Sequence, residues 1–212
     1  MKIGQFIALS LSLLAGYVSA QDMAPAKLPT PKPGEAVATF AGGCFWAQEE
    51  AFDQLKGVRE VISGYAGGHT KNPTYREVGT DETGHAETVQ VYYDPNVISY
   101  NDLLVGFFAA HDPTTLNRQG PDAGRDYRSV AFYRTPAEKE AIQEAIKTVN
   151  VSKHYGGPVV TEVVPFSVFY PAEGYHQNYC KLHPDQGYIQ SVSLPKVAKM
   201  RKAMAGKLKP GA

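Results

Sequence analysis

The sequence predicts an α+β fold: a two-layer sandwich in which helices cover one face of a single sheet. Two observations support this. Strand-like runs and amphipathic helical runs alternate in the order β-α-β-β-α-β, followed by further elements at the C-terminal end. The chain has 212 residues, of which 43% are hydrophobic and 20% are charged. That size and composition are typical of one globular domain, or at most two small ones.

The two ends of the chain differ from its centre. Lys2 precedes an apolar run over residues 6–18, and small residues follow at 19 and 20, which predicts a signal peptide over residues 1–20. The run is shorter than the roughly 20 apolar residues of a membrane span, so we expect no stable membrane insertion but an exported protein, periplasmic or secreted. The prolines in residues 21–35 predict an extended tether. Residues 36–212 then form a single catalytic domain ending in a lysine-rich tail.

The first half of the domain begins with a strand over residues 36–40 that stops at Gly42-Gly43. Residues 44–55 follow as an amphipathic helix, with Ala47, Ala51 and Leu55 four residues apart. Residues 58–65 are extended, and a loop reaches to about residue 84. Residues 86–93 alternate as a strand, on which Glu87 shares one face with the apolar residues at 89 and 91.

In the second half, Ser99 caps a helix that runs through residue 110 and carries an apolar stripe. An irregular stretch over residues 111–126 leads to a strand over 128–133. Thr135-Pro136 then begins a helix that reaches about residue 153. A further strand over 159–164 and a short helix over 173–182 complete the prediction. This succession is typical of a ferredoxin-like core with C-terminal additions.

Charge and cysteine content exclude several classes of function. Lys plus Arg number 21 and Asp plus Glu number 21, so the basic excess of a nucleic-acid binder is missing. Two cysteines cannot form a disulfide-dense scaffold or a four-cysteine zinc site. His176, Cys180 and His183 would share one face of a continuous helix, but a fourth ligand is not evident. We therefore predict no metal and no cofactor.

The chemistry is concentrated at Gly42-Gly43-Cys44-Phe45-Trp46. Two glycines let the backbone approach a ligand closely, and Cys44 lies at the N-terminus of a helix. Helix N-terminal amides stabilise an anion, so we expect a lowered pKa for the Cys44 thiol and a reactive thiolate. The alternative is a buried cysteine that acts as a small apolar residue. The strand–Gly-Gly–Cys–helix context with its two aromatic residues favours the nucleophile.

This motif resembles the signature of the A-type peptide-methionine sulfoxide reductases. The resemblance covers roughly residues 36–190, in order and without a large gap. Its further segments are Gly64-Tyr65-Ala66-Gly67-Gly68, Asn72-Pro73-Thr74-Tyr75, Thr83-Gly84-His85-Ala86-Glu87, Tyr92-Tyr93-Asp94-Pro95, His111-Asp112-Pro113-Thr114, Tyr127-Arg128-Ser129 and Tyr175-His176-Gln177.

The resemblance implies a role for each site residue. Cys44 matches the nucleophile, which becomes a sulfenic acid as methionine leaves. Glu87 matches the acid that serves the sulfoxide oxygen, and burial would keep it neutral. The other matches are Tyr75 and Tyr127, which hold that oxygen; Phe45 and Trp46, which receive the S-methyl group; Asp122, which binds the substrate backbone; and His176, which supports or contacts the substrate site.

Two routes could return the Cys44 sulfenic acid to the thiol. Family members use thioredoxin-like donors, and many carry a second cysteine in a C-terminal tail that this chain lacks. Cys180 is therefore the only internal thiol that could resolve the sulfenic acid; direct recycling by an external thiol is the alternative. We expect a monomer whose partners are methionine sulfoxide in proteins or peptides and a thioredoxin-like reductant. An exported Cys/His acyl-transfer enzyme and a non-catalytic redox module are the alternative functions.

Overall fold

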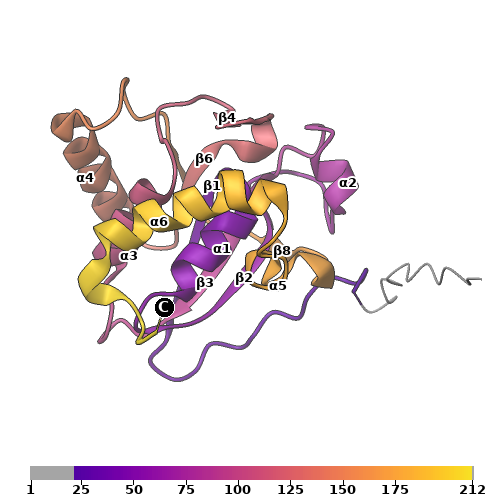
Figure 1. The fold of residues 1–212 in the computed structure, drawn as a ribbon, viewed down its shortest axis with the longest axis horizontal. Helices are drawn as coiled ribbons and strands as arrows, with labels where there is room; N and C mark the ends of the chain where they lie inside the picture. Colours follow the sequence, from indigo (N-terminus) through magenta and orange to yellow (C-terminus); the bar gives the residue numbers. More distant parts are fainter. Residues whose placement is uncertain (1–21, 212) are drawn as a thin grey trace, which may run out of the picture.

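The computed structural model describes residues 22–211, so the predicted signal peptide lies outside the described residues. The described chain is a mixed α/β structure built on one main sheet (Figure 1). The strands of this sheet are β1 (Ala36–Gly42), β2 (Val58–Ala66), β3 (Ala86–Tyr93), β6 (Ser129–Tyr133), β7 (Glu162–Pro165) and β8 (Phe169–Pro171). Two short strands, β4 (Arg118–Gln119) and β5 (Asp122–Ala123), pair separately.

The strands of the main sheet lie in the order β7-β6-β1-β3-β2-β8. β6 and β7 are parallel, and every other neighbouring pair is antiparallel. The four strands that the sequence placed in a β-α-β-β-α-β unit therefore occupy the centre, in the order β6-β1-β3-β2.

Helices cover one face of the sheet in two tiers. The α-helices are α1 (Phe45–Asp53), α2 (Tyr75–Val78), α3 (Tyr100–Ala110), α4 (Pro136–Ser152), α5 (Tyr179–Leu182) and α6 (Leu194–Ala203). α1 and α3 pack on the central strands, and α6 crosses over both of them (Figure 1). The prediction of two layers was incomplete, because the C-terminal helix adds a partial outer one.

Local sequence explains where the long helices begin. Ser99 and Asp102 form a reciprocal capping box at the start of α3. The Thr135 hydroxyl accepts a hydrogen bond from the Glu138 amide at the start of α4, and Pro136 follows in the first turn. Both starting points agree with the prediction.

The core lies between the sheet and the helices. Phe40 of β1 stacks on Phe52 of α1 and Phe107 of α3, with ring centroids 5.6 and 4.9 Å apart. Burial of one such side chain contributes about 1.5–3 kcal/mol. Residues that alternate with the core positions along the strands, such as Ala41 of β1 and Ile62 of β2, form a second, smaller apolar cluster.

The predicted helix over residues 173–182 is wrong in its continuity. It divides into the 3-10 turn η2 (Gly174–His176) and α5 because Asn178, between them, has a φ of 56°, which an α-helix cannot accommodate. His176 and Cys180 therefore do not share a helix face. Within residues 22–211, no group of three or more His, Cys, Asp or Glu side chains could hold a metal ion.

Both ends of the described chain pack against the domain. The N-terminal segment pairs with residues 172–175, which follow β8 and lead into η2; the Ala26 amide, for example, donates to the Ala172 carbonyl at 2.9 Å. The lysine-rich tail is α6, whose Val197 and Met200 are buried in the main core. It is preceded by the π-helical turn η3 (Ile189–Ser193) and followed by the 3-10 turn η4 (Ala205–Lys207).

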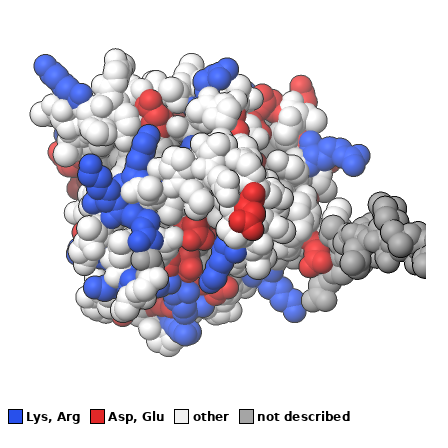
Figure 2. All heavy atoms as spheres, in the orientation of Figure 1, with Lys and Arg blue, Asp and Glu red and all other residues white. Residues whose placement is uncertain are grey.

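The surface carries charges of both signs. On the face drawn in Figure 2, basic and acidic side chains are interspersed over a mostly uncharged surface, with several basic ones gathered toward the left edge. In the part of the chain that is described, no helix combines the length and the apolar character needed to cross a membrane.

Candidate active site

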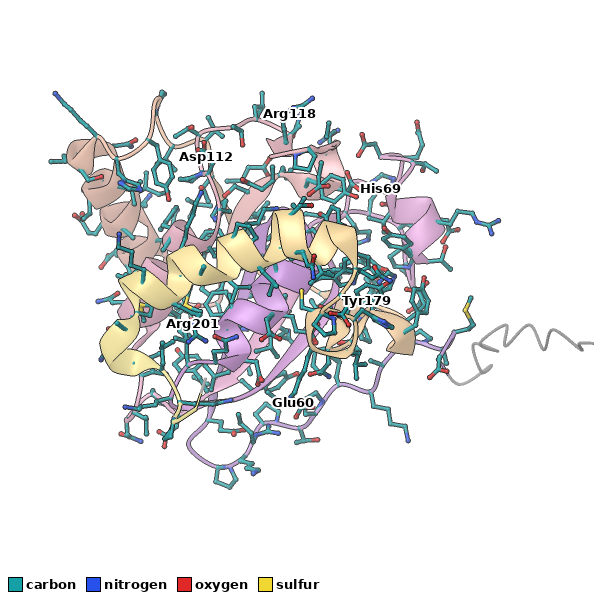
Figure 3. All side chains as sticks on the ribbon, in the orientation of Figure 1. Glu60, His69, Asp112, Arg118, Tyr179 and Arg201 are labelled. Carbon is teal, nitrogen blue, oxygen red and sulfur yellow. The ribbon has the colours of Figure 1, made fainter. Side chains whose placement is uncertain are left out.

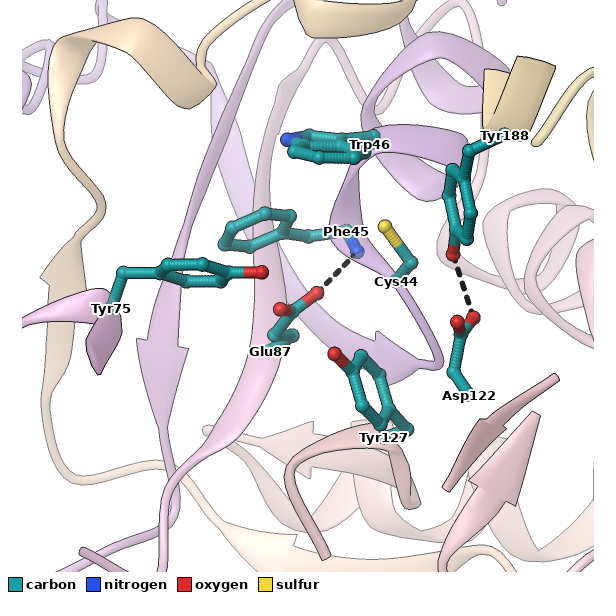
Figure 4. A pocket seen from close by; sticks show the side chains of 8 residues that line it. All are labelled: Cys44, Phe45, Trp46, Tyr75, Glu87, Asp122, Tyr127 and Tyr188. Carbon is teal, nitrogen blue, oxygen red and sulfur yellow. Dashed lines mark hydrogen bonds between the residues drawn. The ribbon is translucent and has the colours of Figure 1, made fainter. Parts of the chain in front are cut away.

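A cavity of about 220 Å³ opens at the N-terminus of α1. It brings together residues from both halves of the chain (Figure 4). Its lining residues are Cys44, Phe45, Trp46, Tyr75, Glu87, Asp122, Tyr127 and Tyr188. Seven of these eight were predicted from the sequence. Tyr188 was not, and the predicted residues His176 and Cys180 lie outside the lining.

The glycine pair before Cys44 is required by close packing. Gly43 has a φ of +82°, and a Cβ there would lie 2.5 Å from the Gln119 side chain. A Cβ on Gly42 would lie 2.7 Å from the Gln48 amide nitrogen. β1 can therefore turn directly into α1, which places Cys44 at the N-cap position, 5% exposed.

The electrostatics of the Cys44 thiol differ from the prediction. Burial, and then the carboxylate form of Glu87, raise the pKa of Cys44 well above its ordinary value. The Trp46 amide, the Tyr188 hydroxyl and the Lys196 ammonium lower it by less. The expectation of a net lowered pKa was wrong, because the helix N-terminus is too deeply buried for its amides to outweigh desolvation.

Glu87 is held at the same helix N-terminus. The Phe45 amide donates a hydrogen bond to Glu87 Oε2 at 3.0 Å, and the residue is 2% exposed. The pKa of Glu87 is raised to about 8: burial is the largest cause, Asp126 and Asp122 also raise the pKa, and the Phe45 amide and Lys196 lower it. Glu87 is therefore largely protonated at pH 7, in a position to donate a proton.

Two tyrosine hydroxyls point toward the Glu87 carboxyl group (Figure 4). Tyr75 begins α2, and Tyr127 ends the 3-10 turn η1 (Arg125–Tyr127). Burial raises the pKa of both phenols, so that both remain hydrogen-bond donors. Glu173 fixes the start of α2: its carboxylate accepts from the Tyr75 amide at 3.0 Å and from the Tyr65 hydroxyl at 2.9 Å.

The aromatic wall of the pocket is held from behind. Trp46 stacks on Tyr179, which is labelled in Figure 3, with ring centroids 3.9 Å apart. The Trp46 indole N–H donates to His176 Nδ1 at 3.2 Å. Burial lowers the pKa of His176 to about 4, so that the ring is neutral and can accept this bond. The structure thus places His176 behind Trp46 and against Tyr75, with ring centroids 4.4 Å apart in the latter contact.

Asp122 lies at the opposite side of the pocket from Tyr75. The Tyr188 hydroxyl donates to Asp122 Oδ2 at 2.7 Å, and Lys196 Nζ lies 3.7 Å from the same oxygen. Its predicted role in binding the substrate backbone stays a prediction. Tyr188, Lys196 and Glu173 were missed by the sequence analysis, since none carries a local pattern that distinguishes it.

Cys180 lies beside α1, outside the pocket. Its Sγ donates to the Trp46 carbonyl at 3.3 Å, and burial raises the pKa of the thiol to about 12. Ser193, at the end of η3, interacts with the same thiol, while Tyr188, just before η3, interacts with Cys44. Both cysteines are free and buried, and the segment 188–193 contacts each of them.

Comparisons with known proteins agree on one family. The family described as peptide methionine sulfoxide reductase matches residues 36–208. A protein of Deinococcus radiodurans named peptide methionine sulfoxide reductase MsrA is 51% identical over 180 residues, which are 84% of this chain and 87% of the relative.

Solved structures with the same fold point in the same direction. Methionine sulfoxide reductase A of Corynebacterium diphtheriae superposes with a TM-score of 0.69 at 32% identity, covering 79% of this chain and 91% of that one. Mxr1 of Saccharomyces cerevisiae, in its complex with Trx2, superposes with a TM-score of 0.51 at 25% identity, covering 72% and 91%.

Proposed function

Because this chain belongs to the peptide methionine sulfoxide reductase family, we propose that it reduces methionine S-sulfoxide to methionine through a sulfenic acid on Cys44. The observation that supports this best is the content of the pocket. A thiol, a protonated carboxyl group and two phenol donors surround one cavity with an aromatic wall. The substrates are methionine sulfoxide residues of oxidised proteins or peptides, and an assay with the free amino acid tests whether free methionine sulfoxide is reduced as well.

The chemical step transfers one oxygen atom between two sulfur atoms. Cys44 Sγ attacks the sulfoxide, the methionine S–O bond breaks, and the oxygen ends on Cys44 as a sulfenic acid. Glu87 gives its proton to the oxygen, and the proton of the Cys44 thiol replaces it, so that Glu87 is unchanged. The methionine sulfur gains two electrons and the cysteine sulfur loses two.

The remaining lining residues orient the substrate. The hydroxyls of Tyr75 and Tyr127 face Glu87 and would donate hydrogen bonds to the same oxygen. Phe45 and Trp46 offer an apolar surface for the S-methyl group and exclude water from the sulfenic acid. Of these, the Trp46 ring is fixed by Tyr179, which stacks on one face, and by His176, which accepts from the indole N–H.

A Cys/His acyl-transfer mechanism fits the site less well. Such an enzyme needs a histidine that can take the thiol proton. Histidine is missing from the described lining of the pocket, and His176 uses Nδ1 to hold Trp46. A buried neutral Glu87 with two phenols would also have no part in acyl transfer.

The defining experiment compares the two epimers of dabsyl-methionine sulfoxide with dithiothreitol as reductant. We expect turnover of the S epimer and its loss in Cys44→Ser. Turnover of the R epimer alone, or unchanged activity in the variant, would contradict the proposal.

For regeneration we propose that Cys180 attacks the Cys44 sulfenic acid, releasing water and forming a disulfide that a thioredoxin-like protein reduces. The position of Cys180 beside Trp46, the second residue after Cys44, supports this, as does the segment 188–193, which contacts both thiols. One equivalent of substrate should consume both thiols and yield a Cys44–Cys180 peptide. A stable sulfenic acid beside a free Cys180 would instead show recycling by an external thiol.

We further propose that residues 1–20 direct export, so that the enzyme, as a monomer, repairs exported proteins. The apolar run and the small residues at 19 and 20 support this. N-terminal sequencing of the protein from a periplasmic or secreted fraction should begin at Gln21; an intact Met1 in the cytoplasm would contradict export.

As a description of the fold, we infer a ferredoxin-like core. The central strand order β6-β1-β3-β2, with antiparallel neighbours and α1 and α3 on one face, supports it.

A further inference from the structure

A buried ammonium group lies beside the proposed nucleophile. Lys196 of α6 is 9% exposed, and its Nζ has no hydrogen-bond partner within residues 22–211. The nearest acid is Asp122, whose Oδ2 is 3.7 Å away. Lysine is seldom buried so deeply without strong pairing, because removing the ammonium group from water is costly.

The ammonium group lies against the turn that presents Cys44. A Cβ on Gly43 would be 3.6 Å from Lys196 Nζ. Six other elements or their edges contribute the titratable groups that face Cys44, which are Glu87, Asp122, Tyr75, Tyr127, Tyr188 and Lys196. Those that face Lys196 are Asp122, Cys44, Glu87, His111 and Cys180.

Among the groups facing Cys44, Lys196 is the one of positive charge. We propose that Lys196 is a positioning residue whose charge stabilises the Cys44 thiolate, and that Asp122, itself held by Tyr188, is the ion-pair partner of the ammonium group. The consequence for sulfoxide reduction rests on the proposed function, whereas the charge effect on Cys44 does not.

The balance of charges explains why such a cation is needed. With Glu87 protonated, Asp122 is the fixed negative charge of the pocket lining, and a thiolate would be a second one in the same buried space. The Lys196 ammonium group offsets the negative charge of Asp122 and attracts the Cys44 thiolate. Without it, burial and Asp122 would both oppose ionisation of the thiol.

The test measures alkylation of Cys44 by iodoacetamide across pH, followed on the Cys44 peptide by mass spectrometry. In Lys196→Met we expect a rate at least about tenfold lower at the same pH, and a profile shifted upward by about one pH unit. Lys196→Arg should restore most of the rate, because the charge returns. Lys199→Met, on the exposed side of the same helix, is the matched control and should leave the rate unchanged.

A second pair of variants separates this role from simple neutralisation of Asp122. Asp122→Asn has no carboxylate to neutralise, so we compare it with Asp122→Asn/Lys196→Met, which leaves no unpaired buried charge even if Lys196→Met alone fails to fold. We expect alkylation at least about tenfold slower in the double variant. Equal rates within this pair would overturn the proposal. Alkylation needs no sulfoxide, so a failure of the proposed function would leave this result intact.

Discussion

The first backbone amide of α1, that of Phe45, donates a hydrogen bond to the Glu87 side chain. The Phe45 N–H points at Glu87 Oε2, so the positive end of the helix is shared between the carboxyl group and the Cys44 thiol. Desolvation exceeds this effect at both groups and raises both pKa values. The resting site therefore holds a thiol and a carboxylic acid, and a proton is available where the sulfoxide oxygen would arrive.

Substitution of Glu87 by glutamine should slow the transfer of oxygen to Cys44. The amide can still donate a hydrogen bond but cannot release a proton, so we expect sulfenic acid formation in a single turnover to slow by roughly 10²- to 10⁴-fold. Glu49→Gln is the matched control: Glu49 is also buried with its pKa raised to about 8, but it bonds Ser63 and the Asn178 amide away from the pocket. An unchanged single-turnover rate in Glu87→Gln would remove Glu87 from the mechanism.

The same pKa sets the pH dependence of the reaction. Since Glu87 must be protonated to act, the single-turnover rate should be highest below its pKa of about 8 and fall above it. In Glu87→Gln this decline should disappear. Stopped-flow single turnovers from pH 6 to 9 measure both; a wild-type rate that rises steadily across this range would contradict the assignment.

The site residues that could be predicted from the sequence are those placed by local structure. Cys44, Phe45 and Trp46 are contiguous, and Glu87 follows from strand alternation, since a residue two positions from Val89 must share its face. Tyr188 and Lys196 reach the pocket only through the packing of the C-terminal segment, and no local periodicity encodes that contact.

Elements were predicted well where their ends are set locally. The caps of α3 and α4 are made within four residues, so their starts were predictable. The break at Asn178 was not, because it depends on a distant contact: the Asn178 amide donates to Glu49 of α1 at 2.9 Å. The same kind of long-range packing makes the lysine-rich tail into the helix α6.

A stability measurement tests whether α6 is part of the core. Met200 is fully buried between α6 and α3, so Met200→Ala should lower the free energy of unfolding by about 2–5 kcal/mol. Lys199→Ala, at the adjacent exposed position, should change it by less than about 0.5 kcal/mol. Urea titrations of both variants decide the matter. Equal urea midpoints for the two variants would mean that α6 contributes little to the core.

At the scale of the whole molecule, the first segment of the described chain and the C-terminal helix α6 both contribute to the site. The N-terminal segment pairs with the backbone beside Glu173, which holds Tyr75, and the C-terminal helix carries Lys196. The active site thus depends on the folded whole, which concentrates ionisable groups in places that water does not reach.

Four of those buried groups form two pairs whose contributions to stability change with pH in opposite directions. Glu49 and Glu87 have pKa values raised to about 8, so the native state keeps their protons more tightly than the unfolded chain does between about pH 4.5 and 8. Their stabilisation is complete below this window and is lost as pH rises through it. His111 and His176 have pKa values lowered to about 4, so their contribution is present above pH 6.5 and is lost as pH falls toward 4.

We therefore expect the summed contribution of these four groups to be nearly constant from about pH 4.5 to 6.5, and stability to fall from there toward pH 8. Between about pH 4.5 and 6.5 the two sets oppose each other, whereas above pH 6.5 the unfolded histidines lose their remaining protons and the two glutamates dominate. Each glutamate contributes about 1.4 kcal/mol per pH unit, so the free energy of unfolding should drop by on the order of 2–4 kcal/mol between pH 6.5 and 8. Urea unfolding at the two pH values measures the drop. In Glu49→Gln/Glu87→Gln the drop should largely vanish, because neither side chain then binds a proton in this range. A double variant that keeps the full pH dependence would show that other groups cause it.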